Sequence, residues 1–189
     1  MIIVNYQKFK SNSYLFLNFE KRELPMSIKK RKPIIGVIGG REEASDLAYS
    51  LGKMVAENDY LLLTGGGPGV MESASKGAAE IGGIVIGVLP NEKTNPIQGY
   101  PNEYVNVPIF TGMSDARNAL IAKSCDVIVA LSGGAGTLSE IALAIKSGTP
   151  VVGLNCPTFN VTTNGLFVRV STLNEVVREV KKFLKEIRS

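Results

Sequence analysis

The feature that most constrains this sequence is a regular alternation of short apolar runs with longer amphipathic segments. Runs such as 33–38 and 84–89 are apolar at nearly every position instead of at every second one, which is typical of strands covered on both faces. Amphipathic segments such as 42–57 are long enough to return the chain across a sheet. The alternation therefore predicts a parallel sheet built from βα units with right-handed crossovers.

We expect an α/β protein with one doubly wound, Rossmann-like domain: a mostly parallel sheet of six to seven strands with helices on both faces. The expected strands span residues 33–38, 60–63, 84–89, 104–109, 126–131, 150–154 and 166–170. The expected helices span residues 42–57, 68–81, 114–124, 137–146 and 173–187. Ligands bind such sheets at the carboxyl ends of the strands, so the segments that follow each strand are the candidates for function.

Composition excludes several classes of protein. The 189 residues are 44% apolar and 20% charged, which is typical of a folded domain. No stretch approaches the roughly 18 apolar residues of a membrane span, so we expect no membrane association. Two distant cysteines, Cys125 and Cys156, and no secretory signal pattern predict a cytoplasmic protein without disulfides or a metal site. The absence of histidine excludes a Ser-His-Asp triad and an HExxH zinc site.

Positive charge is concentrated at the amino terminus. Residues 1–32 hold eight of the 21 basic residues but only two of the 17 acidic ones. We expect this segment to be an extension outside the core, and residues 33–189 to form the Rossmann-like domain. Because the remaining 157 residues are slightly acidic, with 13 basic and 15 acidic residues, the sequence disfavours a nucleic-acid partner.

Three glycine-rich segments follow the expected strands 33–38, 60–63 and 126–131. Glycine lets a backbone approach a ligand closely, and the helix that begins after each segment offers unpaired N–H groups. Tight strand-to-helix turns alone could also explain each segment. Together they predict a phosphate-binding site, with these candidate residues: Gly39, Gly40, Gly65, Gly66, Gly67, Gly69, Ser132, Gly133, Gly134, Gly136 and Thr137.

Two familiar nucleotide motifs are missing from these segments. A P-loop needs a Lys followed by Ser or Thr after its last glycine, and neither 65–71 nor 132–138 has that lysine. The dinucleotide fingerprint fails because Val70 and Ser139 stand where its third glycine belongs. ATP hydrolysis of the P-loop type and NAD binding are therefore disfavoured.

Two charged residues are candidates for chemistry at the same edge of the sheet. Glu140 is near the start of the helix after strand 126–131, and Arg117 is in the first turn of the preceding helix. An arginine can hold phosphate or carboxylate through two hydrogen bonds. The alternatives are a capping box, in which Glu140 bonds back to a cap at Thr137, and a surface ion pair of Arg117 with Asp115 or Glu103.

At these residues the chain resembles the LOG family of Rossmann proteins, often mislabelled lysine decarboxylases. The resemblance is carried by segments 65–72, 86–90 and 132–140, the last similar to the family signature Pro-Gly-Gly-x-Gly-Thr-x-x-Glu. Segment 111–119 is most similar to the molybdenum cofactor carrier-like branch of that family. The resemblance adds Pro90, Met113 and Asn118 to the candidate ligand-binding residues.

The resemblance implies that the protein is a nucleoside 5′-monophosphate phosphoribohydrolase, releasing a free base and ribose 5-phosphate. Glu140 and Arg117 would be its catalytic residues, and 133–137 would hold the phosphate. Two departures from the hydrolases, Ser132 in place of the motif proline and Asn118 in place of lysine, keep a second reading open. In that reading the protein carries or senses the molybdenum cofactor, a related pterin or a nucleotide without cleaving it.

Three further expectations complete the sequence analysis. The partner is a small phosphorylated ligand, either a nucleotide or the molybdenum cofactor, and no other cofactor is required. DNA handling, as in DprA-type Rossmann proteins, is a third and weaker reading. The apolar residues of helix 137–146 span too wide an arc for one core face, which predicts a homodimer or a higher homo-oligomer.

Overall fold

The computed structural model describes residues 31–42 and 45–188, and residues 32–189 form one compact unit. Nearly all of the basic segment 1–32 lies outside the described residues, so its separation from the core stays a prediction. Within the described part of the chain, no helix is long and apolar enough to cross a membrane.

The described residues build one seven-stranded sheet in which every neighbouring pair of strands is parallel, in the order β4-β3-β2-β1-β5-β6-β7. This confirms the predicted Rossmann-like α/β fold. The strands are β1 (Ile34–Ile38), β2 (Leu61–Thr64), β3 (Val85–Leu89), β4 (Val107–Phe110), β5 (Val127–Ala130), β6 (Val151–Leu154) and β7 (Phe167–Val170).

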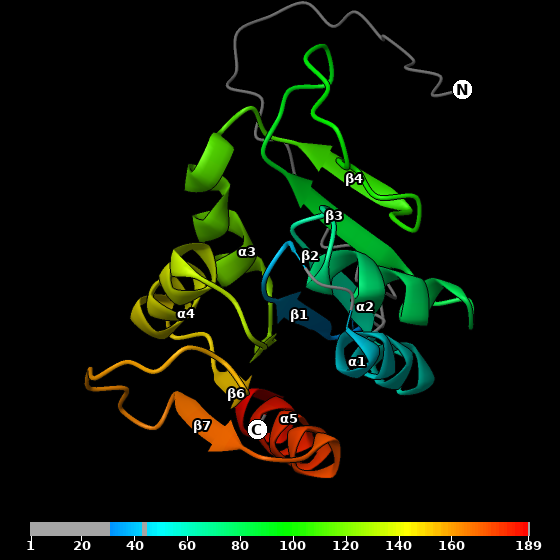
Figure 1. Cartoon of the computed structure of the whole chain (residues 1–189). Coiled ribbons are helices and arrows are strands. Elements are labelled where there is room, and N and C mark those ends of the chain that lie inside the picture. The colour runs from blue at the N-terminus through cyan, green and yellow to red at the C-terminus, as the bar shows by residue number, and fades with distance from the viewer. Residues whose placement is uncertain (1–30, 43–44, 189) are drawn as a thin grey trace, which may run out of the picture. The chain divides into compact units, whose positions relative to one another are not determined.

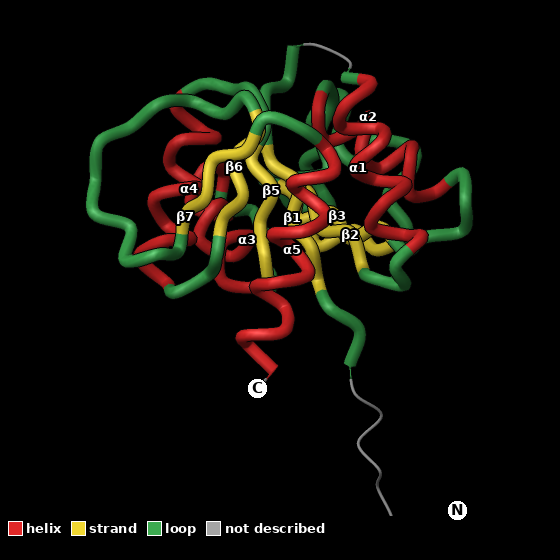
Figure 2. The backbone as a smooth tube through the Cα atoms, turned by 90° about the horizontal axis from the view of Figure 1, so that it is seen from below, coloured by secondary structure: helices red, strands yellow, loops and turns green. Residues whose placement is uncertain are grey.

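Helices cover both faces of the sheet (Figures 1 and 2). Helices α1, α2 and α5 pack on one face and α3 and α4 on the other, each group with its own apolar cluster. Burying one such side chain fully contributes roughly 1.5–3 kcal/mol. The helices are α1 (Asp46–Glu57), α2 (Val70–Ala79), the 3-10 turn η1 (Ser114–Arg117), α3 (Asn118–Ser124), α4 (Ala135–Ser147) and α5 (Leu173–Arg188).

Element boundaries differ from the expected ones where caps and loops decide them. Helix α1 begins at Asp46 instead of residue 42, because the side chain of Ser45 accepts a hydrogen bond from the N–H of Ala48 and caps it. Helix α4 begins at Ala135, two residues before the expected start, with Gly134 as its cap. Strand β4 begins at Val107 instead of residue 104.

The sheet order reverses direction between β1 and β5, which creates a topological switch point. From β1 the chain adds β2, β3 and β4 on one side and then β5, β6 and β7 on the other. The helices that follow β1 and β5, α1 and α4, lie on opposite faces of the sheet, which opens a crevice at the carboxyl ends of these two strands. The fold places the candidate site in that crevice.

Candidate functional site

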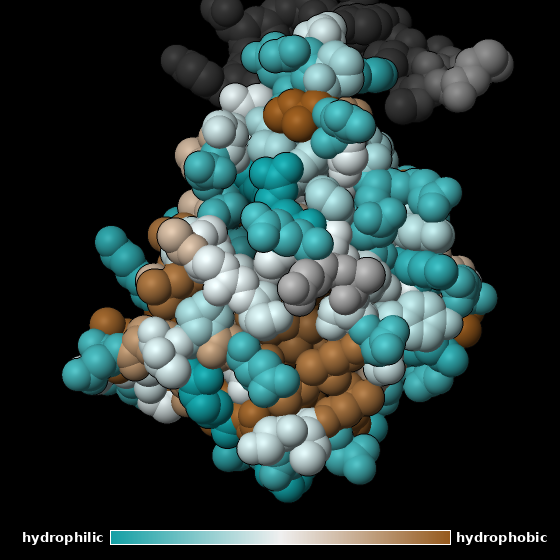
Figure 3. Space-filling view, in the orientation of Figure 1, coloured by the Kyte–Doolittle hydropathy of each residue, from teal (hydrophilic) through white to brown (hydrophobic). Residues whose placement is uncertain are grey.

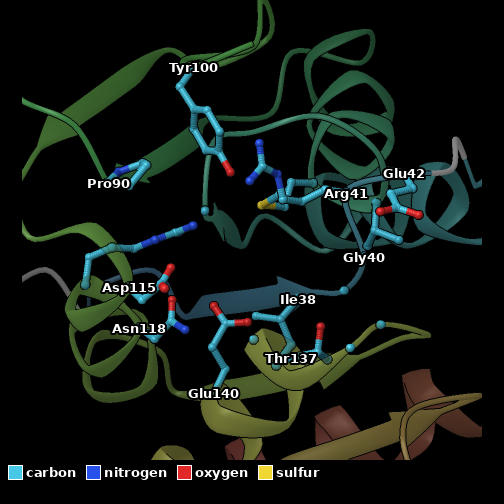
Figure 4. Close-up of a pocket in the computed structure, with 18 of the residues that line it drawn as sticks. Ile38, Gly40, Arg41, Glu42, Pro90, Tyr100, Asp115, Asn118, Thr137 and Glu140 are labelled. Carbon is cyan, nitrogen blue, oxygen red and sulfur yellow. The ribbon is translucent and has the colours of Figure 1, made fainter. Parts of the chain in front are cut away.

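A pocket of about 700 Å³ opens at this switch point (Figure 4). Ligand pockets typically measure about 300–1,000 Å³, so this one can hold a nucleotide-sized molecule. Residues at or after the carboxyl ends of β1, β2, β3, β4 and β5 line it, namely Ile38, Gly39, Gly40, Arg41, Glu42, Ser45, Gly65, Val70, Met71, Pro90, Ile97, Tyr100, Ser114, Asp115, Arg117, Asn118, Ser132, Gly133, Gly134, Gly136, Thr137 and Glu140.

The start of α4 forms the floor of the pocket. Its cap, Gly134, makes no side-chain hydrogen bond, so the first N–H groups of the helix have no capping acceptor. A Cβ added to Gly134 or Gly136 would meet nothing within 4 Å, so this backbone is open on the side away from the helix. Open N–H groups and the positive end of the helix dipole make this turn suited to bind an anion.

The loop after β1 packs directly on the loop after β5. The N–H of Gly40 donates a hydrogen bond of 2.8 Å to the carbonyl of Ser132. A Cβ on Gly39 would lie 3.0 Å from the carbonyl oxygen of Ser132 and 2.7 Å from a methyl carbon of Val70, so a larger residue would push the loop away from both neighbours. The two predicted glycine segments therefore form one continuous surface.

The loop after β2 contributes less to the pocket lining than the loops after β1 and β5. Gly65 lines the pocket, and its missing Cβ leaves room for the guanidinium of Arg117. Gly66 and Gly69 have φ of +72°, a conformation that favours glycine. The ring of Tyr100 packs against Gly67. The structure places Gly66, Gly67 and Gly69 outside the pocket lining, where they shape the loop and pack it against its neighbours.

Arg117 is buried and anchored to the main chain. Its Nη1 donates a hydrogen bond of 2.9 Å to the carbonyl of Val88, and its buried Nε has no hydrogen-bond partner. It is 8% exposed, which contradicts the alternative of a surface ion pair with Asp115 or Glu103. Instead, the arginine fixes the 3-10 turn η1 against the end of β3.

Glu140 lies in the wall of the pocket, 8% exposed and with its carboxylate facing the open space (Figure 4). The capping-box alternative is wrong, because the cap is Gly134 and Thr137 is already inside the helix. Burial raises the pKa of Glu140 from 4.5 to about 7, and the nearby charge of Arg117 partly opposes that rise. Near neutral pH the carboxyl can therefore either donate or accept a proton.

A chain of two hydrogen bonds connects α3 to the first turn of α4. Asn118 Nδ2 donates to Ser139 Oγ at 3.0 Å, and Ser139 Oγ donates to the carbonyl of Gly136 at 2.7 Å. Pro90 lines the pocket, and its carbonyl accepts a hydrogen bond from the N–H of Ser114 at 2.9 Å.

Met113 does not line the pocket. It immediately precedes η1 and is 43% exposed, so the structure places this predicted ligand residue on the surface.

Several pocket residues were missed by the sequence analysis. Arg41 and Glu42 directly follow the first glycine pair, a position that could have indicated them. Ile97 and Tyr100 also reach the pocket, from the long Pro-rich loop after β3, a segment whose sequence is compatible both with a loop over a ligand and with a plain surface loop. Among the described residues, no group of three His, Cys, Asp or Glu side chains could hold a metal ion.

The chain belongs to the SLOG cluster4 family, whose model matches residues 32–183. An uncharacterised protein of Archaeoglobus fulgidus is 41% identical over 126 residues, which are 65% of this chain and 80% of the relative.

The relatives also include cytokinin riboside 5′-monophosphate phosphoribohydrolases. One from Rhodococcoides fascians is 31% identical over 107 residues, which are 56% of this chain and 54% of the enzyme. A probable one from Oryza sativa is 36% identical over 104 residues, which are 54% of this chain and 45% of the enzyme. The chain thus spans about half the length of these curated enzymes.

Solved structures of molybdenum cofactor proteins match more of the chain. The molybdenum cofactor binding protein of Rippkaea orientalis is 37% identical with a TM-score of 0.74, and the match covers 82% of this chain and 99% of that one. The molybdenum cofactor carrier protein of Chlamydomonas reinhardtii is 39% identical with a TM-score of 0.73 and the same coverage. These likenesses confirm a LOG family member close to the molybdenum cofactor carrier branch.

For the hypothesis of DNA handling, the comparisons show only a similar fold. DNA processing protein A of Helicobacter pylori has a TM-score of 0.60 at 17% identity, covering 79% of this chain and 80% of that one. The TM-score indicates a similar architecture, and an identity this low gives no support for a shared activity.

Proposed function

We propose that the protein binds a phosphorylated small molecule in this pocket and acts as a carrier of the molybdenum cofactor or a related pterin phosphate. The observation that carries the proposal is the start of α4, which has no side-chain capping hydrogen bond and opens into a pocket of about 700 Å³. The phosphate would bind the first N–H groups of that helix, near Gly134, Gly136 and Thr137. The pterin would occupy the space between Glu140 and the loop after β3.

Likeness to the cofactor-binding proteins supports the carrier over the enzyme. The match to the Rippkaea and Chlamydomonas proteins extends over 82% of the chain, whereas the match to the phosphoribohydrolases covers little more than half. The two departures in the motif, Ser132 and Asn118, also favour binding without cleavage. Asn118 is engaged with Ser139 at the edge of the pocket.

Glu140 suits such a ligand because it is buried and has no hydrogen-bond partner among the described residues. A pterin ring carries adjacent N–H groups, from which an ionised carboxylate can accept hydrogen bonds. It also carries acceptor atoms, to which a protonated carboxyl group can donate one. With a pKa of about 7, Glu140 can either accept a hydrogen bond from the pterin or donate one to it near neutral pH.

Glu140 also favours a second candidate, the nucleoside 5′-monophosphate phosphoribohydrolase. In that reaction the bond from C1′ of the ribose to the base breaks and a bond from C1′ to the oxygen of water forms. The base leaves with the electron pair and takes up a proton, and water supplies the hydroxyl group. The ionised carboxylate of Glu140 would accept the proton of water and stabilise positive charge on the ribose.

The carrier is tested by what the protein retains during purification. We would express it in a host that makes the molybdenum cofactor, and measure oxidised pterin by fluorescence chromatography and molybdenum by mass spectrometry. Gly136→Asp places a negative charge beside the phosphate site, while Gly136→Ala is its matched control because a Cβ there meets nothing within 4 Å. Pterin bound to the alanine variant and lost in the aspartate variant supports the proposal; wild type free of pterin contradicts it.

The hydrolase is tested with a panel of nucleoside 5′-monophosphates, following free base and ribose 5-phosphate. Release that Glu140→Gln abolishes would establish the enzyme. Release that survives this substitution would exclude Glu140 as its catalytic residue, and no release from any monophosphate would contradict the hydrolase.

A further inference from the structure

Arg41 is an exposed cation at the edge of the pocket, held by an aromatic ring. Its guanidinium carbon lies 5.3 Å from the centroid of the Tyr100 ring, within the range of a cation–π contact. Figure 4 shows Arg41 beside Tyr100, with Thr137 of α4 on the opposite side of the pocket. Among the described residues, Arg41 has no hydrogen bond or ion pair to a protein acceptor. Its N–H donors are therefore free for a ligand.

The aromatic support for Arg41 is itself fixed. Tyr100 is 7% exposed, its ring packs against Gly67, and its N–H donates to the carbonyl of Ile97 at 3.0 Å. Two residues further on, Asn102 donates from its side chain to the carbonyl of Gly67 at 2.9 Å. The ring thus has one position relative to the loop after β2.

The backbone of Arg41 is fixed as well. The preceding carbonyl, that of Gly40, accepts a hydrogen bond of 3.0 Å from the N–H of Val70. A Cβ on Gly69 would lie 2.6 Å from the carbonyl carbon of Arg41, so this main chain packs tightly on the start of α2. The fixed main chain and the contact with the Tyr100 ring both restrict the guanidinium of Arg41. It therefore loses little conformational entropy when it binds an anion.

The other arginine of the pocket is not available in the same way. Arg117 already donates to the carbonyl of Val88 and is 8% exposed. Glu42, which also lines the pocket, lies on the side of Arg41 away from Tyr100 (Figure 4). A guanidinium stacked on a ring keeps its N–H edges free, and these edges match the geometry of an oxyanion.

We propose that Arg41, supported by Tyr100, forms a second anion-binding subsite, separate from the start of α4. The ligand is then a small molecule with anionic groups at two positions, one on each side of the pocket. This inference rests on the proposed function and specifies the class of ligand.

Inorganic phosphate is the probe, because it can enter each subsite alone. We would titrate the full-length protein with phosphate at constant ionic strength and follow the backbone amides of 133–137 and the Nε–H of Arg41 by NMR. We expect both sets of signals to shift, with separate affinities. Arg41→Gln should weaken the binding reported by the amides of 40–42 roughly tenfold or more, and leave the affinity reported by 133–137 within about twofold.

Two variants complete the design. Lys53→Gln is the matched control, because it also removes one positive charge and one cation–π contact, that of Lys53 with Tyr49 at 6.0 Å, outside the pocket. Gly136→Asp should abolish the response of 133–137 while the Nε–H of Arg41 still shifts. Lys53→Gln should match wild type at both subsites.

The outcomes separate the two proposals. An Arg41→Gln protein whose amides at 40–42 respond as in wild type overturns the second subsite and leaves the phosphate site of α4 in place. A single affinity lost in both Arg41→Gln and Gly136→Asp also overturns it, because one anion would then bridge both. Two subsites in a protein that retains neither pterin nor nucleotide would support this inference against the proposed carrier. No response in wild type overturns both.

Discussion

The guanidinium of Arg117 donates its hydrogen bond to the carbonyl of Val88, so its charge reaches the carboxylate of Glu140 through space and not through a hydrogen bond. Arg117 can therefore lower the pKa of Glu140 but cannot satisfy its oxygens. The two residues that the sequence analysis expected to act as a pair have separate tasks in the structure. Arg117 holds η1 in place, and Glu140 remains open to the pocket.

Glu140 should make the stability of the protein depend on pH. Its pKa is about 7 in the folded chain and 4.5 when exposed, so the folded state binds the proton more tightly. Stability is then full below about pH 4.5 and falls as the pH rises through 7, by roughly 3 kcal/mol at the limit. Urea unfolding at several pH values should show this loss in wild type and a smaller one in Glu140→Gln. Parallel profiles for the two proteins would contradict the raised pKa.

Arg117→Gln should raise the pKa of Glu140 further. The charge of Arg117 is the influence that lowers this pKa, and removing it leaves burial unopposed. A carboxyl carbon titration by NMR would measure the shift, with Lys123→Gln as a control that removes a positive charge from the exposed end of α3. An unchanged midpoint in Arg117→Gln would mean that the two groups are not coupled.

Gly67→Ala should destabilise the protein by roughly 1–3 kcal/mol, because its Cβ would collide with the ring of Tyr100. The matched control is Gly136→Ala, whose Cβ meets open space and which should be neutral or stabilising within a helix. Chemical denaturation of both variants measures the difference. Equal stabilities would show that the loop after β3 moves away easily.

A homo-oligomer remains our expectation from the apolar character of α4. Ile141 and Ala144 are buried within the chain, whereas Ala142 is exposed on the same helix. If α4 packs against a second copy, Ala142→Glu should reduce the mass measured by light scattering. The monomer fold should keep its circular dichroism spectrum. A wild type that is monomeric at micromolar concentration would refute the expectation.

The apolar strands were predictable because their runs of Val, Ile and Leu are buried on both faces. β5 is buried at every position, as such a run predicts. β4 was placed less accurately, since it lies at the sheet edge and its Val107 and Ile109 stay more than 40% exposed. An edge strand has weaker pattern constraints, and its bounds depend on the loop before it.

The candidate site was predictable as far as it follows from topology. Glycines that follow β1 and β5 had to meet at the carboxyl edge of the sheet, and Gly40 does contact Ser132. The contact between Arg41 and Tyr100 was not predictable, because it depends on the path of a loop far along the chain. Hydrogen bonds from Asn102 to the loop after β2 set that path, and no periodic pattern in the sequence encodes them.

Much of the face seen in Figure 3 is hydrophilic, with apolar side chains gathered between α1 and α5. Leu47, Leu173 and Val177 are partly buried apolar side chains of these two helices. They pack against the buried apolar cluster that α1, α2 and α5 share.

The hydrogen bond between Gly40 and Ser132 ties together the two halves of the sheet's ligand-binding edge. Because it forms when the chain folds, the floor of the pocket has its shape before a ligand arrives. Such a site is preorganised, so an incoming molecule has to order little of the protein backbone when it binds. Discrimination between ligands should then appear in how long each one stays bound, and less in how fast it enters.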